Sequence, residues 1–292
     1  MDRPVRKPDW LKVRLCSGER SARLKALFQK YNLHTVCQEA RCPNQGECWQ
    51  RGAATLMLLG DVCTRGCRFC AVRSGNPAGI VDPKEPENIA KAIGEMDLSY
   101  VVLTMVNRDD LPDGGAAHIV ETVQRIRSRN DSVRIETLVG DFAGNRRDVF
   151  TVVKRAEPDV YAHNVEVVPR LQSLMRDARC SWKRSLDTLA WAREAGTRFT
   201  KTSIMVGCGE TKEEVLDAMR KLRAVRVDLL TIGQYLRPTQ KQAEVVSYPH
   251  PDEFNVYREA GLEMGFKSIF SGPLVRSSYR AEQTFINGIR NQ

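Results

Sequence analysis

The feature that most constrains the fold is a regular alternation, from residue 53 onward, of short apolar segments with amphipathic segments of helical period. Glycine and Asp/Asn residues separate the segments, as expected for turns. Strands that alternate with helices need crossover connections, so the pattern predicts a parallel sheet with helices outside. The predicted strands span 54–60, 100–105, 133–139, 159–163, 199–206 and 228–234, and the predicted helices span 87–96, 116–129, 146–155, 181–195 and 212–225.

Six such units predict an α/β fold, a partial (β/α)6 TIM-type barrel two units short of closure. We expect three segments: an N-terminal extension (1–52), the barrel (53–240) and a C-terminal extension (241–292). The first extension contains a predicted helix near 21–31. The last contains a predicted helix at 252–264, a short apolar run and a final helix. An open barrel needs a cover, and we expect the extensions to supply it.

Six of the nine cysteines fall into two groups with short spacings. The first group reads C-x4-C-x5-C and the second reads C-x3-C-x2-C, directly after the first predicted strand. The groups are Cys37, Cys42 and Cys48, and Cys63, Cys67 and Cys70. Three thiolates can hold three irons of a cubane iron–sulfur cluster and leave the fourth iron open. Zinc is the alternative, but it needs four ligands, and His34 could complete one group only.

Cysteine count, apolar runs and net charge indicate the cellular compartment and the kind of partner. The total of nine cysteines is odd and their spacing is clustered, which does not indicate a disulfide framework, so a reducing, cytoplasmic location is expected. The longest apolar runs are too short to span a bilayer, and the N-terminus lacks the apolar stretch of a secretory signal. The net charge of +9 favours an acidic partner. Cys16, Cys180 and Cys208 lie outside both groups and are expected to be structural thiols.

The second cysteine group, with Phe69 before its last cysteine and a position after the first strand of a partial barrel, resembles the radical S-adenosylmethionine superfamily. The first group, together with the C-terminal sequence RSSY, is similar to the lipoyl synthase family. The resemblance runs over most of the chain, through HTVCQEARCPNQGECW, DVCTRGCRFCAV, DDLPDGG, AHNVEVVPR, QYLRP and GPLVRSSYR.

This resemblance implies two 4Fe–4S clusters with different tasks. Cys63, Cys67 and Cys70 would hold the cluster whose open iron binds S-adenosylmethionine, and its cleavage would produce a 5′-deoxyadenosyl radical. That radical would remove hydrogen from C6 and C8 of an octanoyl chain. The second cluster would donate its sulfides to these carbons, giving lipoyl-lysine. Its implied ligands are Cys37, Cys42, Cys48 and Ser278.

Five residues at the ends of predicted strands or nearby are candidates for binding S-adenosylmethionine. Asp110 would help to seat the methionine part, and Asn164 and Glu166 would bind the ribose hydroxyls or the amino group. Arg184 would pair with the carboxylate, and Gly207 would let the adenine approach the backbone. For Asp110 the alternative is an acidic turn, and for Arg184 a surface helix position.

Two further observations limit these assignments. Ser203 stands where the family commonly has glycine, which weakens the adenine assignment. His163 is expected to be a hydrogen-bonded structural residue.

The resemblance implies partners as well. We expect an octanoylated, acidic lipoyl carrier domain as substrate and a low-potential electron donor. We expect a monomer that binds neither nucleic acid nor a membrane. Two alternatives stay open at this point. One is a radical enzyme that thiolates nucleic acid, although no RNA-binding motif is present. The other is a non-catalytic two-cluster electron carrier, for which six β/α units are more scaffold than required.

Overall fold

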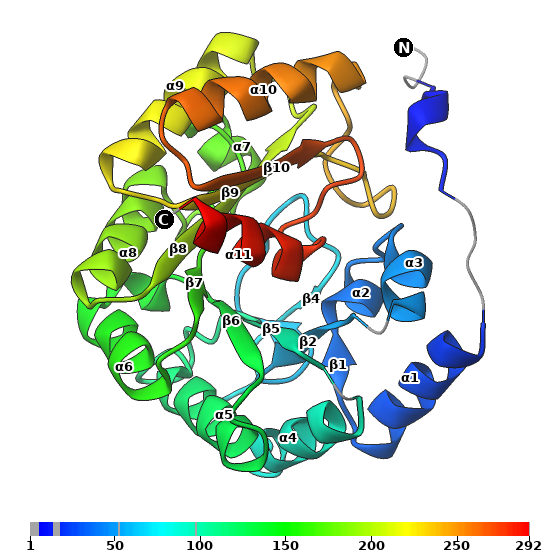
Figure 1. Cartoon of the computed structure of the whole chain (residues 1–292), viewed down its shortest axis with the longest axis vertical. Helices are drawn as coiled ribbons and strands as arrows, with labels where there is room; N and C mark the ends of the chain where they lie inside the picture. The colour runs from blue at the N-terminus through cyan, green and yellow to red at the C-terminus, as the bar shows by residue number, and fades with distance from the viewer. Residues whose placement is uncertain (1–5, 14–17, 52, 97, 292) are drawn as a thin grey trace.

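The computed structural model describes residues 6–13, 18–51, 53–96 and 98–291. Cys16, predicted to be a structural thiol, lies outside these residues. The strands curve around a common centre and the larger helices form a layer outside them (Figure 1). Structure and sequence pattern therefore agree on an α/β barrel-like architecture.

Within the described residues, eight strands form one sheet in the order β1-β2-β5-β6-β7-β8-β9-β10. All neighbouring pairs from β2 to β10 are parallel, and β1 pairs with β2 antiparallel. The strands are β1 (His34–Thr35), β2 (Thr55–Leu58), β5 (Tyr100–Met105), β6 (Arg134–Leu138), β7 (Val160–Ala162), β8 (Phe199–Val206), β9 (Leu229–Gln234) and β10 (Ser268–Gly272).

The six predicted strands are confirmed as β2 and β5 to β9. Strand β10 extends the parallel sheet beyond the six predicted units, because the apolar run in the C-terminal extension pairs with β9 along its whole length. The sheet does not close within the described residues, since β1 and β10 lie at opposite ends of the strand order. A separate two-stranded sheet, β3 (Val62–Cys63) with β4 (Arg73–Ser74), brackets the second cysteine group.

The five helices predicted between strands are also confirmed. They are α4 (Glu85–Met96), α5 (Ala116–Arg129), α6 (Arg146–Ala156), α8 (Trp182–Glu194) and α9 (Lys212–Ala224). Side chains cap several N-termini: Asn145 caps α6, Ser181 caps α8, and Thr211 forms a capping box with Glu214 at α9.

The extensions contribute three longer helices, and short helical elements occur both in the extensions and between the barrel strands. The longer helices are α1 (Glu19–Lys30), α10 (Pro251–Glu263) and α11 (Ala281–Arg290), which match the predicted terminal helices. The short elements are α2 (Val36–Glu39), α3 (Gln45–Gln50), α7 (Gln172–Met175) and the 3-10 turns η1 (Asp9–Leu11), η2 (Phe142–Gly144) and η3 (Pro169–Leu171).

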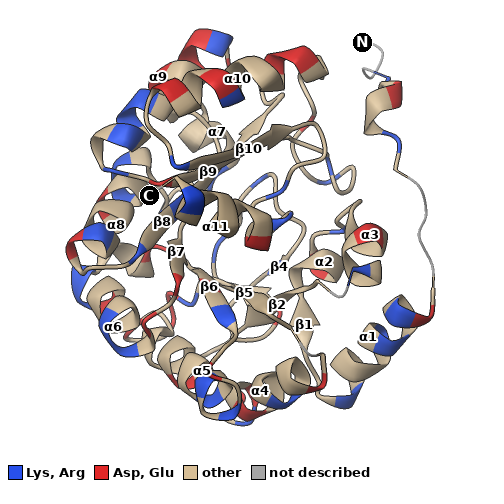
Figure 2. Ribbon diagram, viewed as in Figure 1, with Lys and Arg blue, Asp and Glu red and all other residues tan. Residues whose placement is uncertain are grey.

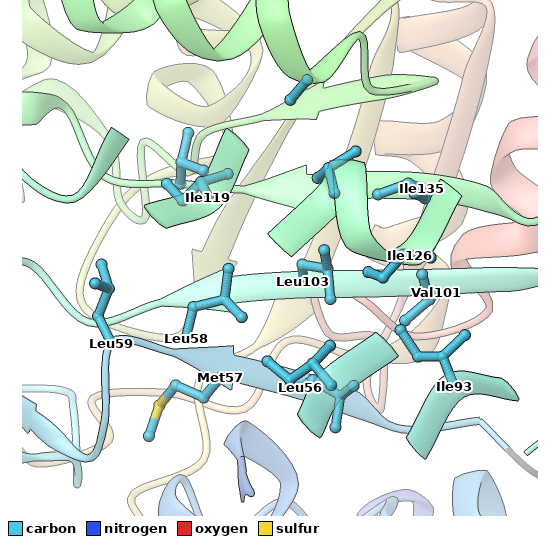
Figure 3. Packing of buried hydrophobic residues seen from close by; sticks show 14 of the residues in the cluster. Leu56, Met57, Leu58, Leu59, Ile93, Val101, Leu103, Ile119, Ile126 and Ile135 are labelled. Atoms are coloured by element: carbon cyan, nitrogen blue, oxygen red, sulfur yellow. The ribbon is translucent and has the colours of Figure 1, made fainter. Parts of the chain in front are cut away.

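The main core lies between the sheet and the outer helices. Leu56 of β2 pairs in register with Leu103 of β5, and both are 1% exposed. Their side chains lie on the side of Ile93 of α4, with Ile126 of α5 next to β5 (Figure 3). Full burial of such a side chain stabilises the fold by about 1.5–3 kcal/mol. The alternate strand positions face the barrel interior.

The N-terminal ends of the strands are closed by aromatic packing. Phe285 of α11 packs against Phe199 and Tyr100, with ring centroids 5.6 and 5.7 Å apart respectively. Above this layer, Lys201 Nζ lies 2.8 Å from Glu136 Oε1 in a buried ion pair. Parallel barrels place their active sites at the opposite end, in the loops that follow the strands.

The chain after β10 folds back across the end of β9. A Cβ atom on Gly233 would lie 2.0 Å from the carbonyl oxygen of Val275, so only glycine permits this approach. The segment 272–279, which contains RSSY, is thereby held against the end of β9, and its Ser278 reaches Thr55 at the start of β2.

Candidate active site

The second cysteine group lies on the loop that follows β3. The amide of Arg65 donates to Cys63 Sγ at 3.4 Å, and the amide of Asp177 donates to Cys67 Sγ at 3.4 Å. The amide of Cys70 donates to the carbonyl of Cys67, which makes the loop turn back on itself. Backbone amides directed at sulfur favour thiolates, the form in which cysteine binds iron.

Without iron the thiols of Cys67 and Cys70 hold their protons at neutral pH. Burial raises the pKa of Cys70 to about 11, with the charges of Cys63 and Glu166 adding to the effect. The pKa of Cys67 is raised by its hydrogen bond with Cys180 and by burial. Iron binding therefore has to displace protons, as is usual for thiolate sites.

A buried arginine that sequence reasoning missed anchors this loop. Arg65 lies between Cys63 and Cys67 and is 3% exposed. Its guanidinium donates to Asp109 at 2.8 and 3.0 Å and to Asp141 at 2.5 Å. Burial raises the pKa of both carboxyls, but the hydrogen bonds from Arg65 outweigh it and the net shift is downward. The single charged residue of CTRGC, between two cysteines, was a sequence signal for this network.

A second segment, residues 175–180, lies along the same loop. The amide of Arg68 donates to the carbonyl of Met175, and the amide of Gly66 donates to the Asp177 carboxylate, each at 2.8 Å. Cys180, expected to be a purely structural thiol, shares a hydrogen bond with Cys67. That bond lowers the pKa of Cys180 to about 6 despite its burial, with Arg176 and Arg65 contributing.

Two of the predicted cofactor-binding residues lie beside this loop. Asn164 and Glu166 follow β7, are hydrogen-bonded to each other and are half-buried. The backbone of Glu166 is left-handed (φ 69°) and bonds both Ser203 and Met205 of β8. Burial raises the pKa of Glu166, and Arg176 opposes the shift. The charge of Glu166 raises the pKa of Cys70, so Asn164 and Glu166 lie near the second cysteine group.

Asp110 makes other contacts than those expected. Its two oxygens accept from the guanidinium of buried Arg108, both at 2.8 Å, and one also accepts from the amide of Gly79. The hydrogen bonds from Arg108 lower the pKa of Asp110 to about 2. These contacts favour a role in holding the loop after β5.

Gly207 also makes contacts that differ from the expected one. A Cβ there would lie 2.2 Å from Gln234 Nε2 and 2.5 Å from the carbonyl oxygen of Ser247, and φ is 92°. Its carbonyl accepts from the amide of Val246 at 2.9 Å. Glycine is required at this position because the chain after β9 packs directly on it.

The remaining predicted contacts lie near the Asp141 network. Arg184, at the start of α8, is half-buried and close enough to Asp141 to help lower the pKa of that carboxyl. His163 is buried, with its ring nitrogens 2.8 Å from the carbonyl of Val139 and 3.0 Å from Ser185 Oγ. Burial lowers the pKa of His163 to about 4, which agrees with the structural role expected.

The first cysteine group lies on α2, α3 and their connection. Burial raises the pKa of Cys37, and it raises the pKa of Cys48 to about 12, with the charges of Cys37 and Cys42 adding. The amide of Thr55 at the start of β2 donates to Cys37. The group therefore lies directly beside the barrel sheet.

The C-terminal segment meets this group. Thr55 Oγ1 donates to Ser278 Oγ at 2.8 Å, and Asn44 Nδ2 donates to the carbonyl of Leu274 at 2.6 Å. Arg276 hydrogen-bonds the Cys42 thiol and donates to the carbonyl of Gln234 at 2.8 Å. Ser278 therefore bonds a residue, Thr55, whose amide contacts Cys37, and its role as a cluster ligand stays a prediction.

The donor sets fit iron–sulfur clusters. Each group offers three soft thiol ligands, and the Ser278 hydroxyl reaches the first group through Thr55. Among the described residues, no three His, Cys, Asp or Glu side chains have the arrangement that a single metal ion requires. A cubane makes a different demand, because each of its thiolates binds a separate iron.

The outer helices carry both basic and acidic side chains. Lys and Arg residues occur on α1, α5, α6, α8 and α9, where acidic residues are interspersed with them (Figure 2). In the described part of the chain, no helix has the length and apolar character needed to cross a bilayer.

Known proteins match the chain in family and fold. The Radical SAM superfamily model matches residues 57–222, which run from within β2 into α9 and include the second cysteine group. Two solved structures share the fold, each with a TM-score of 0.57. Methylornithine synthase is 14% identical, with 93% of this chain and 80% of that chain covered. HydG, a hydrogenase maturase, is 15% identical, with 94% and 61% covered. The protein is therefore an enzyme of the radical SAM class, which uses S-adenosylmethionine and a 4Fe–4S cluster.

Sequence relatives narrow the assignment. A model of the N-terminal domain of lipoyl synthase matches residues 2–42. The lipoyl synthase of Sorangium cellulosum is 53% identical over 301 residues, covering 98% of this chain and 81% of the relative. The lipoyl synthase of Thermus thermophilus is 52% identical over 281 residues, covering 96% and 87%. The chain belongs to the lipoyl synthase family.

Proposed function

We propose that this enzyme inserts two sulfur atoms, at C6 and C8, into an octanoyl chain that is amide-linked to a lysine of a lipoyl carrier domain. The observation that carries the proposal is the contact between the RSSY segment and the first cysteine group, through Thr55–Ser278 and Arg276–Cys42. This contact brings a hydroxyl near the first cysteine group, beside the first residue of β2, and so supports a fourth donor for that group.

Two clusters divide the chemistry. One cluster would be held by the second cysteine group, Cys63, Cys67 and Cys70. The other would be held by the first cysteine group, Cys37, Cys42 and Cys48, together with Ser278. When bound, the cluster of the second group with S-adenosylmethionine would supply a 5′-deoxyadenosyl radical, and the cluster of the first group would supply sulfide. A serine oxygen is a harder ligand than a thiolate, so Ser278 is the ligand best suited to release an iron.

The chain's own residues position these groups. Arg65 fixes the loop of the second cysteine group through Asp109 and Asp141. Asn164 and Glu166 offer hydrogen-bonding groups to the amino and ribose groups of S-adenosylmethionine, and Arg184 offers a guanidinium to its carboxylate. Asp110 and Gly207 act through the loops they hold, because their polar groups are already bonded.

The partners follow from the reaction. A low-potential electron donor would supply the electron that the cluster of the second cysteine group needs. The net positive charge suits an acidic carrier domain. The enzyme acts as a monomer in the cytoplasm. Membership of the lipoyl synthase family favours this function over nucleic-acid thiolation and over a non-catalytic electron carrier.

Two single variants test the division of labour. Anaerobically prepared wild-type protein should hold about eight irons, four for each cluster. Cys63→Ala should abolish cleavage of S-adenosylmethionine. Cys37→Ala should still form 5′-deoxyadenosine from S-adenosylmethionine and a reductant, but form no carbon–sulfur bond on an octanoyl-lysyl peptide. Equal loss of cleavage in both variants would refute the separate roles.

A further inference from the structure

The thiol of Cys180 lies against a proposed cluster ligand although it belongs to neither cysteine group. Cys180 and Cys67 share a hydrogen bond between their side chains, and both residues are half-buried. Arg65 Nη1 donates to Cys180 Sγ at 3.4 Å. Two thiols in direct contact beside a cation are the elements of a disulfide site.

The contact is set by the backbone. Residues 66 and 68 of the cluster loop bond residues 177 and 175, and the amide of Asp177 donates to Cys67 Sγ at 3.4 Å. The amide of Cys180 then closes a turn onto the carbonyl of Asp177 at 2.8 Å. The guanidinium of Arg179 adds a 2.5 Å bond to the carbonyl of Thr64. Contacts on both sides of each sulfur hold the two thiols together.

We propose that Cys67 and Cys180 form a reversible disulfide when the cluster of the second cysteine group is lost to oxygen. The two thiols lose two electrons and two protons to dioxygen, which is reduced to hydrogen peroxide. A disulfide is about 2.05 Å long, so two sulfurs in hydrogen-bond contact need only a small approach.

The consequence is protection of a cluster ligand. An exposed thiolate is oxidised stepwise to sulfinic and sulfonic acids, which thiol reductants do not reverse. A disulfide returns to two thiols by exchange with such a reductant. Capture of Cys67 by Cys180 therefore keeps it available for a new cluster. This consequence rests on the proposed ligand role of Cys67, whereas formation of the bond does not.

The chain offers a direct mapping experiment. Trypsin separates the three cysteines of the second group into peptides 52–65, 66–68 and 69–73, and releases Cys180 in peptide 180–183. The full-length, cluster-loaded protein is exposed to air, alkylated under denaturing conditions, digested and analysed by mass spectrometry. We expect a cross-link between peptides 66–68 and 180–183, removed by dithiothreitol, with loss of about two titratable thiols per chain. A link of Cys67 to Cys63 or Cys70 instead, or no link after cluster loss, overturns the proposal.

A matched pair of variants tests the consequence. After air exposure, the wild-type protein and Cys180→Ser are treated anaerobically with dithiothreitol, iron and sulfide. The wild type should regain most of its cluster absorbance, whereas Cys180→Ser should regain less and carry sulfinic acid on Cys67. Cys208→Ser, which removes a buried thiol elsewhere, should behave like the wild type. Equal recovery in all three proteins refutes the protective role.

Iron content separates this inference from the proposed function. If Cys67→Ala binds as much iron as the wild type, the ligand assignment fails while the mapped disulfide stands. If the ligand assignment holds and no cross-link forms, the inference alone fails.

Discussion

Thr55 and Ser278 are 223 positions apart in the chain, yet the hydroxyl of Thr55 donates to that of Ser278 at 2.8 Å. Thr55 starts the first parallel strand, and its amide donates to Cys37. One residue of the sheet therefore contacts both the first cysteine group and the C-terminal segment. The cluster proposed for the first cysteine group depends on this junction.

Replacing Thr55 with valine keeps the β-branched shape and removes the hydroxyl. We expect a loss of about 1 kcal/mol in the free energy of unfolding, the usual value for one hydrogen bond. Ser278 becomes free to turn, so iron bound at the first cysteine group should fall, while formation of 5′-deoxyadenosine is retained. Iron analysis and an anaerobic cleavage assay measure this. Thr151→Val is the control, because the hydroxyl of half-buried Thr151 donates to the carbonyl of Arg147 within α6, and an equal effect there would contradict the prediction.

Gly233→Ala tests the close approach of the C-terminal segment to β9. The new Cβ would lie 2.0 Å from the carbonyl oxygen of Val275, so the segment has to move. We expect a destabilisation of about 1–3 kcal/mol, typical of overpacking, together with loss of iron from the first cysteine group. Denaturant unfolding and iron analysis provide the measurements.

Gly94→Ala is the matched control for that variant. Gly94 lies in the interior of α4, and its added Cβ would meet no atom within 4 Å. Alanine should stabilise this helix by about 0.5–1 kcal/mol. A Gly233→Ala protein as stable as this control would show that the C-terminal segment is not closely packed on β9.

Arg65→Met removes the charge that neutralises Asp109 and Asp141. Leaving buried carboxylates unpaired costs about 3–5 kcal/mol. We expect a drop of that order in the free energy of unfolding. We also expect failure to hold the cluster of the second cysteine group. Arg73→Met, which breaks an exposed pair with Asp61, should cost about 1 kcal/mol or less. Addition of Asp141→Asn should restore part of the stability lost in Arg65→Met, and additive losses would argue against the network.

Buried His163 makes stability depend on pH in a defined direction. Its pKa of about 4 lies below the ordinary value of 6.5, so the folded protein favours the neutral ring. Its contribution is complete above pH 6.5 and is lost as the pH falls toward 4, because the unfolded chain takes up the proton first. The slope is about 1.4 kcal/mol per pH unit. His163→Gln should flatten this part of the stability curve measured by anaerobic denaturant unfolding. An unchanged slope would contradict the buried neutral state.

Much of the fold was predictable because local periodicity reports it. The six strands and five intervening helices were expected within a few residues of their observed bounds, since apolar period and capping residues such as Thr211 act locally. Strand β10 was not expected as part of the sheet, because a five-residue apolar run does not reveal its partner strand.

The cysteine spacing by itself indicated two groups of three thiols suited to cubane clusters, because spacing within a short loop limits how many ligands one group can offer. The order of the motifs along the chain added the resemblance to a radical enzyme family. Only the tertiary structure decided which distant residues meet these loops. Arg65 with Asp141, Thr55 with Ser278 and Cys67 with Cys180 are each joined by folding across many residues. Such pairings depend on packing and buried charge, which leave no periodic signal in the sequence.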